Sequence, residues 1–136
     1  MPKVKRIHHV AVVVDDMQKS LSFWRDALGL NLSGVFDVPE QQSQVAFLPT
    51  GGSEIELVRP TSADSGIAKY LAKRGPGLHH VCVEVDDIHA MLARLKSRGV
   101  RLINERPFTA AGGRQYAFIH PESTSGVLVE LYEIAG

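Results

Sequence analysis

The chain has little of several features that define whole classes of protein. Its 136 residues include one cysteine, Cys82, and one tryptophan, and its 15 basic and 15 acidic side chains leave no net charge. A single cysteine excludes an internal disulfide framework and is typical of a reducing compartment. Zero net charge argues against nucleic acid or an anionic membrane as the main partner, because both require a basic surplus.

Long apolar runs are also missing, and we expect no secretory leader. No run approaches the roughly 20 apolar residues that span a bilayer, and Met1 to Arg6 lead straight into a strand-like segment without an apolar h-region. We therefore expect a cytoplasmic protein that binds no membrane. Its 44% hydrophobic content is sufficient for the core of one compact domain.

The sequence contains an internal repeat. Residues 8–16 read HHVAVVVDD and residues 79–87 read HHVCVEVDD, and Ala46-Phe47 and Ala117-Phe118 repeat at the same spacing. Glu56 in EIELV matches Glu130 in LVELY. Because these landmarks keep their order, we predict a duplicated module. The predicted single domain, residues 1–136, contains module one at about 5–60, a connecting helix at about 63–75 and module two at about 77–134.

Each module is predicted to contain one strand, one helix and three further strands. In module one these are strand 8–14, a helix over 17–28, and strands 31–38, 44–48 and 54–58. The apolar stripe of this helix comprises Leu21, Trp24, Leu28 and nearby Phe23. Module two repeats the order with strand 79–85, helix 87–98 and strands near 101–104, 115–120 and 126–132. The predicted fold class is α+β, built from two tandem βαβββ modules.

Strand alternation decides which side chains share a face. The aliphatic face of the first strand begins at His8 and continues through Val10 to Val14, so it must pack on a helix. The opposite faces of the strands carry four polar residues at repeat-related positions: His9, Glu56, His80 and Glu130. We expect the duplication to bring these four together. Two imidazoles and two carboxylates suit Zn, Co, Ni, Mn or Fe(II).

Several stretches resemble the vicinal oxygen chelate superfamily, which includes glyoxalase I, and within it the methylmalonyl-CoA epimerase family. They are IHHVAVVVDD, VPEQQSQVAFLP, EIELVRPTSADSGIAKYLAKRGPGLHHVCVEVDDI, RGVRLINERP and HPESTSGVLVEL. The resemblance covers essentially the whole chain and implies a glyoxalase-like cleft. It places the metal ligands of the family on His9, Glu56, His80 and Glu130. The implied cofactor is one divalent metal ion, with Co the first choice and Mn, Ni, Zn or Mg as alternatives.

The resemblance also implies an isomerase that interconverts (2R)- and (2S)-methylmalonyl-CoA by α-proton abstraction through a metal-stabilised enolate. Epimerisation requires an acid/base on each face of the planar intermediate. Glu130 is the candidate for one face. The second catalytic carboxylate of some family members falls on Gln44 or Val45, and neither is a base. Glu40, or a water held by Gln44, is therefore the candidate for the other face.

The implied partners are an acyl-CoA substrate and a second copy of the chain, as a homodimer. Four cations are candidates for the CoA phosphates: Arg59, Lys69, Arg74 and Arg114. One alternative is a lactoylglutathione lyase with a similar metal set. Another is an Fe(II) extradiol dioxygenase, although that chemistry favours two histidines and one carboxylate. The non-enzymatic alternative is a ligand-sequestering resistance protein, against which a complete set of four ligands argues.

Overall fold

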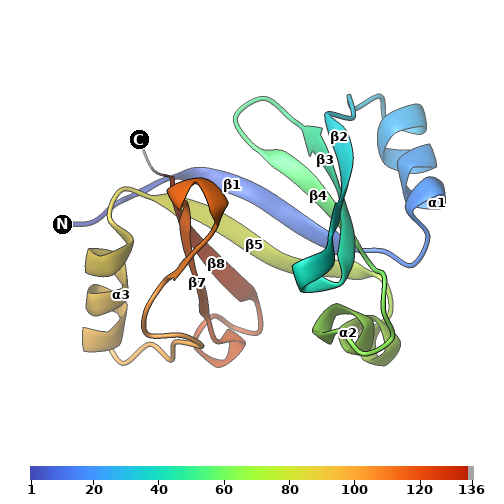
Figure 1. Cartoon of the computed structure of the whole chain (residues 1–136). Coiled ribbons are helices and arrows are strands. Elements are labelled where there is room, and N and C mark those ends of the chain that lie inside the picture. The colour runs from blue at the N-terminus through green and yellow to red at the C-terminus, as the bar shows by residue number, and fades with distance from the viewer. Residues whose placement is uncertain (135–136) are drawn as a thin grey trace. The chain divides into compact units, whose positions relative to one another are not determined.

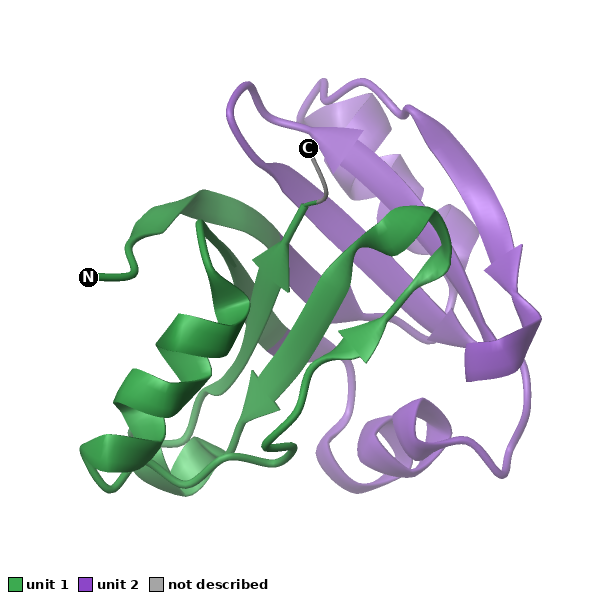
Figure 2. Cartoon of the chain, turned by 60° about the vertical axis from the view of Figure 1, so that its left-hand side comes forward, with its two compact units in different colours: residues 1–9, 80–136 green, residues 10–79 purple. Residues whose placement is uncertain are grey.

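The computed structural model in Figure 1 describes residues 1–134. The chain divides into two compact units, which Figure 2 distinguishes by colour. Unit 2 is residues 10–79, and unit 1 combines residues 1–9 with the chain from residue 80 onward. Strands β1 (Val4–Val13) and β5 (Gly77–Val85) therefore contribute residues to both units. The start of β1 thus groups with the second module of the sequence repeat rather than with the first.

Unit 2 contains a sheet in which β2, β3 and β4 are antiparallel, together with the helices of the first module. Its elements after β1 are α1 (Met17–Leu21), the π-helix η1 (Ser22–Ala27), β2 (Gly34–Val38), the 3-10 helix η2 (Pro39–Gln41), β3 (Ser43–Pro49), β4 (Glu54–Pro60) and α2 (Gly66–Arg74). Strands β2 and β4 pair antiparallel with β3, and β1 follows β4 in the strand order. Helix α1 begins at Asp16 because the Asp16 carboxylate accepts a hydrogen bond from the amide of Lys19 at 3.1 Å.

The predicted α-helix over residues 17–28 is wrong in its second half. In η1 the amide of Leu28 donates to the carbonyl oxygen of Phe23, five residues earlier. A π turn contains more residues than an α turn, so the side chains that follow it rotate away from the apolar stripe. Leu28 and Phe23 are each 54% exposed, whereas Leu21 is buried and Trp24 packs against the core.

The core of unit 2 lies on both faces of its sheet. Leu21, Leu48 and Leu57 are fully buried in one cluster between the sheet and α1. The opposite face carries a second cluster of Ala11, Val45 and Val58, against which Ile67 of α2 packs. Truncation of one of the buried leucines to alanine would cost about 2–5 kcal/mol. Alternation along β4 places Glu56 on the same face as Val58, away from α1.

Unit 1 combines a mixed sheet with one helix. Its elements after β5 are α3 (Ile88–Ser97), β6 (Phe108–Thr109), the 3-10 helix η3 (Ala111–Gly113), β7 (Gln115–Ile119), the 3-10 helix η4 (Pro121–Ser123) and β8 (Leu128–Glu133). Strand β8 pairs parallel with β5 and antiparallel with β7, which pairs antiparallel with β6. Helix α3 starts at Asp87, whose carboxylate caps the amide of Ala90. Ile88 and Leu92 of α3 pack on Val85, Ala117 and Leu131 of the sheet.

The predicted strand near residues 101–104 is wrong. This segment makes only an isolated bridge, between Leu102 and Ile119. The side chain of Asn104 then replaces backbone pairing, because its Oδ1 accepts from the amide of Phe118 at 2.8 Å. Its Nδ2 donates to the carbonyl oxygen of Arg106 at 2.7 Å, which turns the chain away from β7. The second strand of this module is instead the short β6.

The predicted α+β fold class is confirmed, since the described residues form eight strands and three α-helices, with consecutive strands β2 to β4 and β6 to β8. The aliphatic faces also pack as expected, with Val12 and Val14 in the α1 cluster and Val83 and Val85 in the α3 cluster. Within residues 1–134, no helix is long and apolar enough to cross a bilayer.

Candidate metal centre

Three predicted site residues meet in unit 1. His9 lies on β1, His80 on β5 and Glu130 on β8, next to β5 in the sheet. The Nε2 atoms of His9 and His80 are 3.2 Å apart. Oε1 of Glu130 lies 3.0 Å from Nε2 of His80 and 3.4 Å from Nε2 of His9. One oxygen and two nitrogens therefore form a nearly equilateral triangle.

These three side chains are withdrawn from solvent. His9 is 1% and Glu130 5% exposed, and the side chain of His80 is 11% exposed. A buried carboxylate is costly unless it is paired or binds a cation. The sheet supports this arrangement on both sides of Glu130, because Cys82 of β5 and Phe118 of β7 are its register partners.

The spacing of the triangle fits one small cation. Metal–nitrogen bonds of about 2.0–2.1 Å, with angles between about 90° and 109°, separate neighbouring ligand atoms by ~2.9–3.4 Å. The three observed separations are 3.0, 3.2 and 3.4 Å. Two imidazoles and one carboxylate are ligands that suit Zn, Co, Ni, Mn and Fe(II). The donor set and its dimensions therefore fit a divalent transition-metal ion.

The electrostatics of the cluster keep Glu130 ionised. Burial raises the pKa of its carboxyl, but hydrogen bonds from His80 and His9 outweigh burial and lower the pKa to about 2. Glu130 is therefore an anion at neutral pH, which favours its use as a ligand. The same low pKa makes this carboxylate a weak base.

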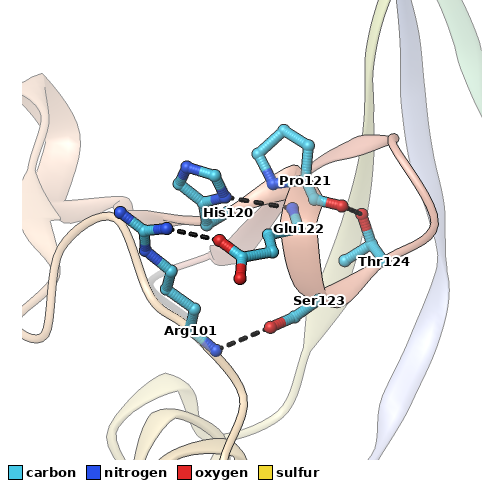
Figure 3. A network of polar contacts seen from close by, with 6 residues as sticks. All are labelled: Arg101, His120, Pro121, Glu122, Ser123 and Thr124. Carbon is cyan, nitrogen blue, oxygen red and sulfur yellow. Dashed lines mark hydrogen bonds and ion pairs between the residues drawn. The ribbon is translucent and has the colours of Figure 1, made fainter.

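A polar network fixes the turn that leads into β8 (Figure 3). Nδ1 of His120 accepts a hydrogen bond from the amide of Glu122 at 3.0 Å, which caps η4. Arg101 holds the same turn twice, through its amide to Oγ of Ser123 at 2.8 Å and through its guanidinium to Glu122. Thr124 donates to the carbonyl oxygen of Pro121. The first half of the segment HPESTSGVLVEL thus forms the turn, and its second half carries Glu130.

His8 lies beside His9 and not on the aliphatic face, so that expectation is wrong. Nδ1 of His8 is 2.9 Å from Nδ1 of His9, and its ring centroid is 4.8 Å from that of Tyr132, which also contacts His9 at 5.4 Å. Burial, and then the charge of His9, lower the pKa of His8 to about 4. The guanidinium of Arg114 lies 4.7 Å above the Tyr132 ring. The repeated His-His pair was the only sequence signal for His8, whereas strand alternation places Tyr132 on the same face as Glu130 without indicating its contact with His8.

The remaining predicted site residues belong to unit 2. Gln44 lies on the α1 side of the sheet, where its Oε1 accepts from Nε of Arg59 at 3.2 Å. Both line a hollow of about 320 Å³ together with Asp15, Asp16, Met17 and Gln18. Glu56 lies on the other side of the same sheet, so unit 2 does not bring Gln44 and Glu56 to one face. Glu40 is exposed in η2. The metal and catalytic roles of these residues stay predictions.

The sequence is similar to a known protein family and to several methylmalonyl-CoA epimerases. A family model, the Glyoxalase/Bleomycin resistance protein/Dioxygenase superfamily, matches residues 8–118. The mitochondrial methylmalonyl-CoA epimerase of Mus musculus is 42% identical over 130 residues, which cover 95% of this chain and 73% of that protein. The ethylmalonyl-CoA/methylmalonyl-CoA epimerase of Cereibacter sphaeroides is 35% identical over 133 residues, which cover 96% of this chain and 99% of that protein.

A solved structure extends the likeness to the fold. It is a variant of the methylmalonyl-CoA epimerase of Streptomyces coelicolor in complex with 2-nitronate-propionyl-CoA. The TM-score is 0.87 at 31% identity, over 98% of this chain and 97% of that one. The chain belongs to the glyoxalase/bleomycin resistance protein/dioxygenase superfamily, and within it to the methylmalonyl-CoA epimerase family.

Proposed function

We propose that this protein is a metal-dependent epimerase that interconverts (2R)- and (2S)-methylmalonyl-CoA. The observation that carries the proposal is the triangle of His9, His80 and Glu130, in a chain whose relatives are epimerases of this substrate. A CoA ester bound to the Streptomyces coelicolor relative supports an acyl-CoA as the substrate class. We further propose that the protein is cytoplasmic and forms a homodimer. Light scattering of the purified protein would test the dimer.

His9, His80 and Glu130 would hold the cation, and we propose Glu56 as the fourth ligand. We prefer Co, with Mn, Ni, Zn and Mg as alternatives. When bound, a divalent cation supplies a Lewis acid for the negative charge that develops on the thioester oxygen. The buried setting of the three residues supports this chemistry, because charge interactions are stronger where water is excluded.

The reaction breaks the C2–H bond on one face of the substrate and forms a new C2–H bond on the other. We assign one of the two proton transfers to Glu130. Its Oε1 lies toward the two imidazoles, so Oε2 is the oxygen that takes and returns the proton. Because the pKa of Glu130 is only about 2, its reaction depends on the acidity of a C–H bond flanked by a carboxylate and a thioester.

For the opposite face we propose Glu40 as the acid/base. An amide such as that of Gln44 does not take up a proton, and Gln44 is engaged by Arg59 on the α1 side of unit 2. The carboxylate of Glu40 is exposed and therefore accessible to a substrate. A water held by Gln44 is the weaker candidate, since Gln44 and Glu56 lie on opposite faces of their sheet.

We propose Arg114 as the cation that contacts an anionic group of the substrate. Its exposed guanidinium lies over Tyr132, whose ring contacts the ligand His9. A guanidinium binds a carboxylate or a phosphate through paired hydrogen bonds. The other cation candidates have less support, since Arg59 holds Gln44 and Arg74 lies 5.3 Å from the Tyr70 ring.

Exchange of the α-proton of methylmalonyl-CoA in D2O, followed by NMR, tests this function. Enzyme loaded with Co²⁺ and enzyme stripped with a chelator are compared, with a sample that lacks enzyme as the background. We expect exchange well above background only with metal. Glu105→Gln serves as the control variant, because Glu105 is exposed and pairs only with Lys96 at the surface.

The absence of exchange in protein that demonstrably holds metal would overturn the epimerase proposal. Hemithioacetal substrates of a lactoylglutathione lyase would then be assayed with the same preparation. Equal exchange with and without metal would support methylmalonyl-CoA as the substrate but overturn the proposed metal dependence.

A further inference from the structure

We infer that His8 is a positioning residue, which accepts a hydrogen bond from Nδ1 of His9 and thereby directs Nε2 of His9 toward the cation. The inference rests on the proposed metal-dependent function and adds a residue outside the four predicted ligands. It is carried by the contacts of the two ring nitrogens of His9.

The two nitrogens of His9 face different partners. Nε2 lies 3.2 Å from Nε2 of His80 and 3.4 Å from Oε1 of Glu130, so it belongs to the ligand triangle. Nδ1 lies 2.9 Å from Nδ1 of His8, on the other side of the ring. His9 is 1% exposed, so water has little access to either nitrogen.

Counting protons assigns the direction of the bond between the histidines. A separation of 2.9 Å between two nitrogens requires that one of them carries a hydrogen and the other does not. A metal-ligating nitrogen carries no proton, so neutral His9 ligating through Nε2 is protonated at Nδ1. His9 is therefore the donor, Nδ1 of His8 is the acceptor, and the proton of His8 is on its Nε2.

The acceptor is held in place by its surroundings. The ring of His8 contacts the ring of Tyr132 at 4.8 Å, and Tyr132 is buried at 8% exposure. The guanidinium of Arg114 lies over the same tyrosine at 4.7 Å. In the repeat-related position, His79 has a different ring contact, to Tyr70 at 4.7 Å. The duplicated histidine pairs have thus diverged in the contacts of their first member.

A histidine acceptor has a chemical consequence. Metal-ligating histidines commonly donate to a carboxylate or a backbone carbonyl, and this partner orients the ring and raises its basicity. The imidazole of His8 orients His9 without adding a negative charge. The cation then keeps more of its positive charge, which favours stabilisation of a developing oxyanion.

The test uses the full-length protein and two variants. His8→Phe retains a ring against Tyr132 but has no acceptor, and His8→Asn supplies an amide oxygen in place of Nδ1. The protonated nitrogens of His8 and His9 are identified in Zn²⁺-loaded protein from their ¹⁵N chemical shifts, because Zn²⁺ is diamagnetic, and the Kd for Co²⁺ is measured from its absorption spectrum. His89→Phe, which removes an exposed imidazole on α3, is the matched control.

We expect His9 of the Zn²⁺-loaded wild type to be protonated at Nδ1 and His8 at Nε2. In His8→Phe the Kd for Co²⁺ should rise by roughly 10–100-fold, the range found when an outer-shell partner is removed. His8→Asn should restore most of the affinity. A proton on Nδ1 of His8 in the Zn²⁺-loaded wild type, or a Kd within twofold of wild type in a folded His8→Phe variant, would overturn the role of His8. A wild type that binds neither Co²⁺ nor Zn²⁺ would instead overturn the proposed function.

Discussion

Oε1 of Glu130 lies 3.0 Å from Nε2 of His80, across the parallel pair β5 and β8. Because the two strands run in parallel, His80 is paired with Leu128, two residues before Glu130 on the same face of β8. The carboxylate is thereby held against an imidazole with little freedom to leave it. Replacement of Glu130 therefore tests both of its proposed roles, as a metal ligand and as an acid/base.

Glu130→Gln keeps the shape of the side chain and removes its charge. We expect α-proton exchange from one epimer to fall by about 10²–10⁴-fold, the range for loss of a general acid/base. Co²⁺ titration of the same variant measures the accompanying loss of affinity. Exchange from both epimers within a fewfold of wild type at saturating metal would contradict the assignment of Glu130, and Glu105→Gln controls for the change of a surface carboxylate.

His80→Ala removes one corner of the triangle. Because the remaining donors are one imidazole and one carboxylate, we expect the Kd for Co²⁺ to rise by more than about 100-fold. Isothermal titration measures this directly. The control is again His89→Phe, which replaces an exposed histidine. His120 is unsuitable as a control because it caps the turn before β8. Unchanged affinity in His80→Ala would show that the cation binds elsewhere.

Glu56 tests whether the metal has three or four protein ligands. If it ligates, Glu56→Ala should weaken Co²⁺ binding, and Glu56→Gln should retain part of the affinity through its amide oxygen. Glu54→Ala, two residues earlier on β4, is the control. If all three variants bind as the wild type does, the ligand set is two histidines and one carboxylate. That result would revive the dioxygenase alternative and call for an assay with Fe(II).

Glu40 is tested through the stereochemistry of exchange. With one acid/base on each face, Glu40→Gln should abolish exchange from one epimer of methylmalonyl-CoA and leave that from the other. Glu130→Gln should affect the opposite epimer. Gln44→Ala should affect neither, because Gln44 bonds to Arg59 on the α1 side of unit 2. Equal losses for both epimers in Glu40→Gln would contradict a role on one face.

Glu84 gives a prediction on stability and pH. Burial raises the pKa of its carboxyl, but hydrogen bonds from Arg6 at 2.8 Å and Lys5 at 3.3 Å outweigh burial and lower it. A folded pKa below the unfolded one contributes stability above the unfolded pKa, near 4, and loses it as the pH falls through the folded pKa. Glu84→Gln should therefore destabilise the protein by about 1 kcal/mol at pH 7, since both cations are largely exposed.

Urea denaturation at pH 7 and in acid measures this difference. The deficit of Glu84→Gln should shrink as the wild-type carboxylate becomes protonated, and 0.5 M salt should reduce it at pH 7. A deficit that grows in acid would contradict the sign of the pKa shift.

The sequence predicted the strands well where apolar alternation and the repeat agreed. It could not predict the end of pairing at Asn104, because the hydrogen bond from the amide of Phe118 to an Asn side chain depends on a residue 14 positions away. It also could not predict η1, since the α and π turns of one apolar segment differ by a single residue per turn.

The repeat and the strand alternation also predicted part of the candidate site. Duplication relates His9 to His80 and Glu56 to Glu130, and alternation assigns each of them to the face opposite the aliphatic side chains. The contact between His8 and Tyr132 involves β1 and β8, and no pattern within either strand indicates it. The orientation of Gln44 was left open because its role came from a resemblance, whereas the register of β3 with β4 decides its face.

The division of the chain into units has a consequence for the order of synthesis. Residues 10–79 are continuous, so unit 2 can complete its internal contacts once they have left the ribosome, as domains generally do. Unit 1 needs the first nine residues together with a segment made much later. His9 is therefore translated before unit 2, whereas Glu130 is translated after it. Under the proposed function, cation capture thus follows the synthesis of unit 2, and a nascent chain that stops before residue 130 would carry an unfinished metal centre.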